Sequence, residues 1–239
     1  MPTRIQSGNG RPARPPAPRP RLRRGAGRPT GAAGEQLRRR ILEAASAEFA
    51  RSGLGGARVE RIAAQAGANV RMLYYYFSSK DDLFLAVLER AYATIREAEK
   101  ALALDKGEPR EAMRRLVRFT WGYYFSHPEF ITLLNSENLH QGRHLERSAR
   151  VSQLHAPFLE MIGRLLERGA RAGVFRHDVD PMQLYISISG LGYFYLSNRY
   201  TLSAIFKRNL MTRERCDARL AHIMDVVLGY LRPQGSSLS

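Results

Sequence analysis

The stretch 59–77 shows the periodicity of two short helices separated by a tight turn. In its first part, apolar residues recur at the spacing i, i+3, i+4 and i+7: Val59, Ile62, Ala63 and Ala66. This spacing places all of them on one face of a helix. Gly67 predicts the end of that helix, because glycine readily adopts the left-handed backbone that stops helices. Asn69 predicts the start of the next one, because its side chain can accept a hydrogen bond from an unpaired amide of the first turn.

The second short helix has an apolar inner face and a polar, aromatic outer face. Leu73 and Phe77 share the inner face. The outer face carries Val70, Arg71, Tyr74 and Tyr75. Two helices joined in this way form a helix-turn-helix, whose second helix enters the major groove of DNA. The pattern therefore predicts a DNA-reading helix over residues 70–77.

The same periodicity predicts helices on either side of this motif. Upstream, residues 35–52 carry an apolar stripe at steps of four, and glycines at 53, 55 and 56 end it. The stripe consists of Leu37, Ile41, Ala45 and Phe49. Downstream, Ser79 and Asp82 resemble a capping box that opens a helix over 80–104. Further helices are predicted over 109–125, 128–140, 144–171, 181–206 and 212–231.

These elements predict an all-α protein. Residues 1–34 are rich in proline, arginine and glycine, which predicts a disordered basic arm because such a segment buries too little apolar surface to fold. Residues 35–83 form a three-helix, helix-turn-helix domain, residues 84–232 a second helical domain, and residues 233–239 a tail. Gly190 and Gly192 indicate a kink or a close backbone approach within their helix.

Positive charge is concentrated at the N-terminus. The net charge is +16, of which residues 1–40 contribute +10 through eleven arginines and one acid. A polycation beside a helix-turn-helix indicates a nucleic-acid partner. Gly10-Arg11-Pro12 and Gly27-Arg28-Pro29 resemble the core of AT-hook segments, which lay arginine into a narrow minor groove. The pattern leaves two alternatives open, a minor-groove arm that uses Arg28 and a solvated tail that adds non-specific affinity.

Several classes of protein are excluded by missing signals. No run of 18 apolar residues predicts a transmembrane helix, and the N-terminus lacks the apolar core of a signal peptide. With a single cysteine, Cys216, this predicts a cytoplasmic protein, associated with the nucleoid when DNA-bound. No glycine-rich phosphate loop, nucleophile elbow or H-E-x-x-H motif is present, so we expect neither an enzyme nor a cofactor.

The run AGANVRMLYYYFSSKDDLF, residues 66–84, resembles the signature of the TetR (tetracycline-repressor) family. The likeness is strong over residues 36–87 and general beyond them. It implies that Tyr74 and Lys80 contact phosphate and that Tyr75 contacts a base or phosphate. On chemical grounds Arg71 suits a guanine edge. Where the family often has two small hydroxyl residues, this chain has Ala57 and Arg58; Arg58 can replace the phosphate contact but not the helix cap.

The resemblance also implies a function for the second domain, namely effector binding and dimerisation. Aromatic walls with a few polar groups describe a ligand pocket. The predicted lining is Trp121, Tyr124, Phe125, Asn138, His155, Phe158 and Phe194. The last two long helices are expected to pair with a second copy through Gly190, Leu191, Tyr195, Ile223 and Val227. An ordinary aromatic core and a kinked internal helix are the structural alternatives.

Glu137, His140 and His144 stand at i, i+3 and i+7, a spacing that could gather metal ligands on an unbroken helix. Because Gly142 interrupts the span, we expect no metal site. The sequence thus predicts a homodimeric regulator that binds double-stranded DNA, with Asn69 and Val70 completing its DNA-contacting set. We expect a repressor that a small molecule releases from a palindromic operator. A transcriptional activator and a nucleoid-type DNA-binding protein without effector remain alternatives.

Overall fold

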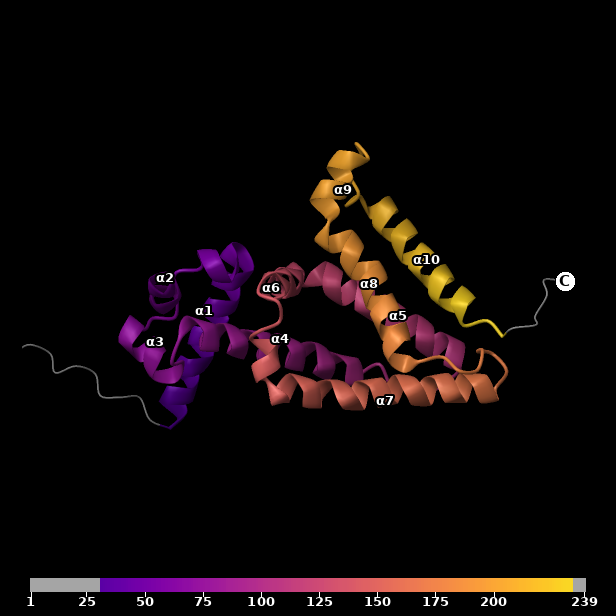
Figure 1. Cartoon of the computed structure of the whole chain (residues 1–239), viewed down its shortest axis with the longest axis horizontal. Coiled ribbons are helices and arrows are strands. Elements are labelled where there is room, and N and C mark those ends of the chain that lie inside the picture. The colour runs from indigo at the N-terminus through magenta and orange to yellow at the C-terminus, as the bar shows by residue number, and fades with distance from the viewer. Residues whose placement is uncertain (1–30, 234–239) are drawn as a thin grey trace, which may run out of the picture.

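The chain folds into helices only, over the residues that the computed structural model describes, 31–233 (Figure 1). The helices are α1 (Ala32–Gly56), α2 (Val59–Gln65), α3 (Val70–Tyr76), α4 (Lys80–Lys100), α5 (Pro109–Ser126), α6 (Pro128–Leu139), α7 (Ala149–Arg171), α8 (Pro181–Ser197), α9 (Arg199–Ile205) and α10 (Arg213–Tyr230). A 3₁₀ turn, η1 (Leu145–Arg147), precedes α7. The predicted all-α fold is confirmed. No helix in the described range is long and apolar enough to cross a membrane.

Local signals in the sequence set the N-terminal helices. Gly53 leaves the helical conformation (φ 63°, ψ 179°) and bends the end of α1 at the predicted break. Gly67 also has a positive φ, of 63°, and turns the chain from α2 towards α3. The side chain of Asn69 caps α3 by accepting a hydrogen bond from the amide of Met72 at 2.8 Å. Ser79 caps α4 in the same way through the amide of Asp82, at 3.0 Å.

Two hydrophobic cores organise the molecule, and α4 belongs to both. The N-terminal core joins α1, α2 and α3 to the first half of α4, which supplies Phe84 and Leu88. The C-terminal core joins α5, α7, α8 and α10 to the second half of α4, which supplies Ile95. In Figure 1, α1–α3 accordingly gather at one end, and α4 leads from them along α7 towards the other helices.

Several helix boundaries differ from the predicted ones. The predicted helix over 144–171 starts later, because Gly142 (φ 78°) turns the chain and Ser148 caps α7. The predicted helix over 181–206 is two helices, α8 and α9, which meet at Asn198. The helix predicted over 80–104 ends at Lys100. Leu104 is nonetheless fully buried. It fits the apolar spacing of the predicted helix because it packs in the core, although the helix itself has already ended.

The first helix also begins earlier than predicted, at Ala32 instead of Glu35. Of the predicted basic arm, residues 1–30, including Arg28, lie outside the described part of the chain. Helix α8 runs through both of its glycines without a break. A Cβ atom at Gly192 would lie 3.6 Å from Tyr124 and 3.7 Å from Trp121, which are ordinary van der Waals distances, so the packing of this glycine against α5 does not require the absence of a side chain.

Candidate DNA-binding face and effector site

Helix α3 presents the predicted DNA-contacting side chains on its outer face. Leu73 is fully buried beneath it, whereas Tyr74 and Tyr75 are 43% and 50% exposed and Arg71 is exposed. Tyr76, in contrast to its two neighbours, is half-buried. Large aromatic side chains are stabilised most when they are buried. Two tyrosines that stay exposed beside an arginine therefore suit burial against a binding partner.

The remaining predicted DNA contacts flank this face. Asn69 is exposed and Val70 half-buried at the start of α3, while Lys80 is half-buried in the first turn of α4. Arg58 is exposed immediately before α2. The first turn of α4 therefore combines helix N-terminal amide groups with the Lys80 ammonium, a combination that suits phosphate oxygens.

Glu48 of α1 holds the start of α2, although it binds the amide of the N-cap residue Arg58 and not an amide of the first turn. Its Oε1 accepts hydrogen bonds from the backbone amide of Arg58 at 3.1 Å and from Nη1 of Arg61 at 3.3 Å, and its Oε2 pairs with Arg51. Burial favours a raised pKa for Glu48, but the bonds from Arg51 and from the Arg58 amide outweigh it and lower the pKa. Sequence reasoning missed this residue, although an acid between Ala45 and Phe49 on the apolar side of α1 was a usable signal.

A cluster of polar contacts joins the start of α4 to the turn after α6. Arg143 and Arg147 pair with Asp81 and Asp82 at 3.5 Å and 2.7 Å, respectively. Hydrogen bonds from Ser79 and then from Arg147 lower the pKa of Asp82. From the end of α1, the amide of Leu54 donates to Ser136 Oγ of α6 at 3.1 Å. Hydrogen bonds and ion pairs therefore connect the N-terminal helices to the C-terminal domain, in addition to the shared helix α4.

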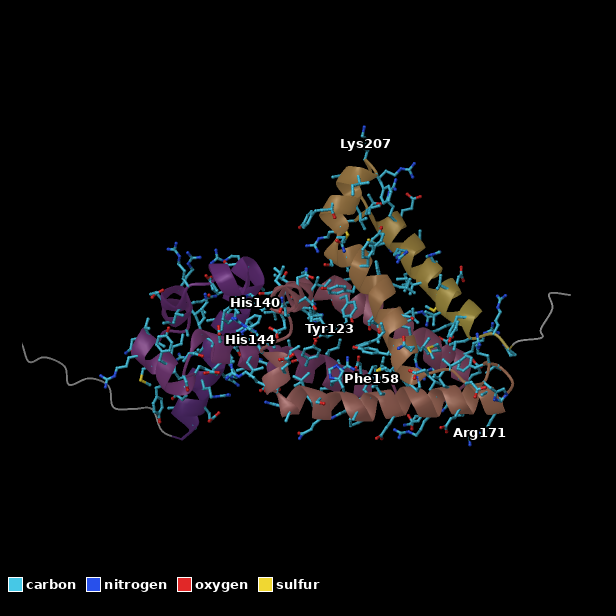
Figure 2. All side chains as sticks on the ribbon, viewed as in Figure 1. Tyr123, His140, His144, Phe158, Arg171 and Lys207 are labelled. Carbon is cyan, nitrogen blue, oxygen red and sulfur yellow. The ribbon has the colours of Figure 1, made fainter. Side chains whose placement is uncertain are left out.

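The residues spaced like metal ligands are Glu137, His140 and His144, and they make hydrogen bonds at this junction. Glu137 Oε1 accepts bonds from the amides of His144 and Leu145 at 2.9 Å and 3.0 Å, and its Oε2 lies 2.6 Å from His144 Nδ1. His140 Nδ1 is bonded to the Ser136 carbonyl oxygen at 2.7 Å. Both histidines lie where α6 approaches the N-terminal helices (Figure 2). Residues 31–233 hold no cluster of three or more His, Cys, Asp or Glu side chains that suits a metal ion.

The predicted effector residues occupy different environments. Trp121, Tyr124 and Phe158 are buried in the C-terminal core. His155 is half-buried and packs edge-on against Tyr92 at a ring distance of 5.2 Å. Burial lowers the pKa of this histidine.

Three other predicted effector residues lie on the surface: Phe125, Phe194 and Asn138. The structure therefore gathers only part of the predicted set, around α5 and α7.

A polar group that sequence reasoning missed lies among the buried aromatic residues. Arg96 and Glu99 of α4 are both almost fully buried, and Arg96 donates a hydrogen bond to Tyr185 Oη of α8 at 3.2 Å. The guanidinium carbon lies 4.2 Å from the centre of the Phe158 ring, on α7. Their signal in the sequence is positional, because both residues continue the inner stripe of α4 that contains Leu88 and Ile95.

Burial dominates the acid–base properties of this group. It raises the pKa of Glu99 to about 8, even though the nearby Arg96 charge opposes the shift. It raises the pKa of Tyr92 to about 12 and that of Tyr124 as well, with Tyr185 contributing to both shifts. The surface pockets described in the structure lie elsewhere, for example a hollow of about 240 Å³ between α1 and α4–α6 and one of about 450 Å³ beside the turn before α8.

The residues predicted for the dimer interface also divide into two groups. Ile223 and Val227 of α10 are buried within the protomer, and Leu191 and Tyr195 of α8 are half-buried. Only Gly190 is exposed. It belongs to an exposed apolar stripe along α8 at steps of four residues: Met182, Ile186, Gly190 and Phe194. Val226 and Tyr230 are exposed on α10.

Known proteins resemble this chain over both of its halves. The family profile "Bacterial regulatory proteins, tetR family" matches residues 41–87, and "Tetracyclin repressor-like, C-terminal domain" matches residues 109–227. The HTH-type transcriptional repressor NicS of Pseudomonas putida is 41% identical over 198 residues, which cover 83% of this chain and 93% of that protein. The HTH-type transcriptional repressor KstR2 of Rhodococcus jostii is 29% identical over 147 residues, covering 60% of this chain and 70% of that protein.

Solved structures share the fold. The transcriptional regulator SCO4942 of Streptomyces coelicolor superposes with a TM-score of 0.61 at 25% identity, covering 82% of this chain and 98% of that one. FadR of Bacillus subtilis, in complex with stearoyl-CoA, superposes with a TM-score of 0.60 at 15% identity, covering 82% and 100%. The chain belongs to the TetR family of bacterial regulatory proteins and is a ligand-responsive, DNA-binding transcriptional regulator rather than an enzyme.

Proposed function

We propose that this protein is a homodimeric repressor whose two α3 helices enter successive major grooves of a palindromic operator. The exposed face of Arg71, Tyr74 and Tyr75, held between two capped helix starts, is the observation that carries this proposal. A two-fold dimer of such motifs requires half-sites about 34–36 Å apart. Arg71 would read a base edge, and Tyr74, Tyr75, Arg58 and Lys80 would fix the register on the backbone.

The dimer would form through α8 and α10. The stripe from Met182 to Phe194 leaves large apolar side chains exposed, and Gly190 at its centre has nothing within 4 Å of a Cβ position. A glycine amid exposed apolar residues suits a second helix that approaches closely. Two copies of α8 and α10 would then bury these surfaces in a four-helix interface, which is isologous in a two-fold dimer.

An effector bound in the C-terminal domain would act on DNA binding through α4. This helix has its first half in the N-terminal core and its second half in the C-terminal core, so a shift of one half moves the other. We assign residues 35–83 to DNA reading and residues 84–232 to effector binding and dimerisation. The dimer would have one state in which the two α3 helices are spaced for the operator and one in which they are not. A ligand that prefers the second state lowers operator affinity by the ratio of its affinities for the two states.

The relatives favour repression. NicS and KstR2 are both named as transcriptional repressors, and the FadR structure contains an acyl-CoA ligand. The names of these relatives and the exposed face of α3 support the same function. The protein would be a repressor that binds nucleoid DNA in the bacterial cytoplasm and is released by a small molecule.

Selection of bound sequences from a random duplex library tests the proposal. We expect enrichment of one palindrome, and subsequent loss of that complex when a member of a small-molecule panel is added. Enrichment without two-fold symmetry would contradict the dimeric reading of DNA. Tight binding without any sequence preference would instead identify a nucleoid-type protein, and increased transcription from a reporter carrying the palindrome would identify an activator.

A further inference from the structure

Arg96 is a buried cation with unused hydrogen-bonding capacity. Its exposed fraction is 5%, and the bond from Nη2 to Tyr185 Oη, at 3.2 Å, is made to a neutral group. Nε lies 3.0 Å from Glu99 Oε2 without the alignment of a hydrogen bond. Nε and Nη1 have no hydrogen-bond partner among the described residues. A guanidinium carries five N–H donors, and leaving them unpaired in a protein interior is costly.

Glu99 compensates this charge only in part. Its carboxyl is as deeply buried as Arg96, and burial raises its pKa to about 8. The carboxyl approaches the guanidinium at Nε only, and Nη1 has no hydrogen-bond partner among the described residues. One additional acceptor group placed beside Nη1 would complete the pairing of Arg96.

Aromatic rings surround the guanidinium. Its carbon lies 4.2 Å from the centre of the Phe158 ring and 5.4 Å from that of Tyr185, and these two rings meet edge to face. Buried Tyr124 of α5 belongs to the same core, and half-buried His155 of α7 packs against Tyr92, which borders that core. Arg96 thus combines aromatic walls with a single buried charge, which are the features of a pocket for a small amphipathic ion.

We infer that Arg96 is the anion-binding residue of the effector site and that the effector is an aromatic or aliphatic monocarboxylate. Its two oxygens would accept hydrogen bonds from Nη1 and Nη2 of Arg96 in place of the Tyr185 hydroxyl, a planar pairing that guanidinium favours. A monocarboxylate offers two acceptor oxygens for Nη1 and Nη2, whereas a dianion would introduce a second buried charge. The apolar part of the molecule would displace Tyr185 and lie against Phe158 and Tyr124.

This assignment rests on the proposed function and identifies the class of its ligand. Arg96 lies on α4, the helix shared by both cores, so a carboxylate that draws the guanidinium away from Tyr185 acts directly on the element that positions α3.

Matched pairs of an acid and its primary amide test the charge preference. The probes are benzoate with benzamide, phenylacetate with phenylacetamide, and hexanoate with hexanamide, each titrated into the full chain at pH 7. Binding is followed by calorimetry and by the emission of Trp121, the single tryptophan. We expect at least one acid to bind about tenfold or more tightly than its amide, because a hydrogen bond to a charged group is lost with the amide.

Variants separate a ligand contact from a structural role. In Arg96→Gln we expect the acid and the amide to bind within about twofold of each other. The matched control is Arg176→Gln, because Arg176 also lies over an aromatic ring, that of Tyr230 at 5.0 Å, and also has an unpaired Nε. This control should keep the full preference for the acid. Arg96→Lys retains the charge without the planar pair and should keep part of it, even if the glutamine variant fails to fold.

Three results would overturn the inference: equal affinity for acids and amides, a preference for acids that survives in Arg96→Gln, or no binding by any pair. Tighter binding of phenyl phosphate than of benzoate would also overturn the assignment to carboxylates. Operator binding is measured separately. A preference for acids that depends on Arg96 but leaves operator affinity unchanged would support this inference and contradict the proposed release from DNA.

Discussion

At the scale of single residues, two buried glutamates have opposite roles. Glu48 is surrounded by Arg51, Arg61 and the amide of Arg58, which lower its pKa, so it is charged and holds α1 to α2. Glu99 has one imperfectly aligned cation, and burial raises its pKa to about 8. The same type of side chain thus serves as a structural anion in the N-terminal core, whereas burial shifts it towards its neutral form in the C-terminal core.

The raised pKa of Glu99 predicts a loss of stability at alkaline pH. A carboxyl whose pKa is higher in the folded state than in the unfolded state stabilises the fold below the unfolded value, near 4.5, and this contribution disappears as the pH rises through about 8. We expect the melting temperature to fall by roughly 5 °C or more between pH 6 and pH 9. Differential scanning calorimetry of Glu99→Gln is the control, since the fall should be much smaller there; an equal fall in both proteins would assign it to other groups.

Arg71 gives the sharpest residue-level prediction about DNA. Arg71→Ala should weaken binding to the selected operator by about 1–3 kcal/mol and relax the preference at one base position in each half-site. Lys80→Ala is the comparison, because a lost phosphate contact weakens binding to all sequences alike. Competition assays with operator variants distinguish the two, and uniform weakening by Arg71→Ala would place Arg71 on phosphate instead.

At the scale of elements, the sequence predicted what local chemistry determines. Caps at Asn69 and Ser79 and the positive φ of Gly67 follow from side-chain type alone, and each was predicted. The boundary between α8 and α9 was not, because no proline or glycine marks Asn198, whose backbone (φ −99°, ψ 14°) leaves the helical region. Arg96 was missed for another reason: its place on the inner stripe of α4 indicates that it faces inward, but no local pattern records which groups of α7 and α8 surround it.

The exposed stripe on α8 predicts which surface holds two copies together. Ile186 is 54% exposed in the protomer, so Ile186→Arg should leave the protomer folded but place an unpaired charge in the proposed interface. We expect monomers at micromolar concentration and at least about a tenfold loss of operator affinity, which corresponds to about 1.4 kcal/mol. Sedimentation measures the first and gel shift the second.

Gln153→Arg on the exposed side of α7 is the control for this change, because it adds the same charge away from α8 and α10. A dimer that persists in Ile186→Arg with unchanged affinity would move the interface to another face.

At the scale of the whole molecule, the charge of the chain predicts how strongly DNA binding depends on salt. Residues 1–30 carry eight arginines and no acid. Each arginine that neutralises a phosphate contributes close to −0.9 to the slope of log affinity against log salt, so deletion of these residues should flatten the slope by several units. Replacing the eight arginines by glutamine keeps the length and should give the same result.

Two further outcomes of this experiment are informative. Loss of a preference for A·T pairs beside the palindrome, in addition to the flatter slope, would identify a minor-groove arm that uses Arg28 or Arg11. An unchanged slope would contradict the role assigned to the basic N-terminus.

Because α4 contributes to both cores, the two halves of this protein are not interchangeable modules. A chimaera joined at the end of α4 would carry Ile95, Arg96 and Glu99 into a foreign C-terminal domain, together with the DNA specificity of α3. Such a fusion would keep part of the ligand chemistry of this chain while losing Phe158 and Tyr185, against which Arg96 packs. An exchange of effector-binding and DNA-binding domains among relatives therefore requires a junction within α4. This junction lies between Leu88 and Ile95, where one core ends and the other begins.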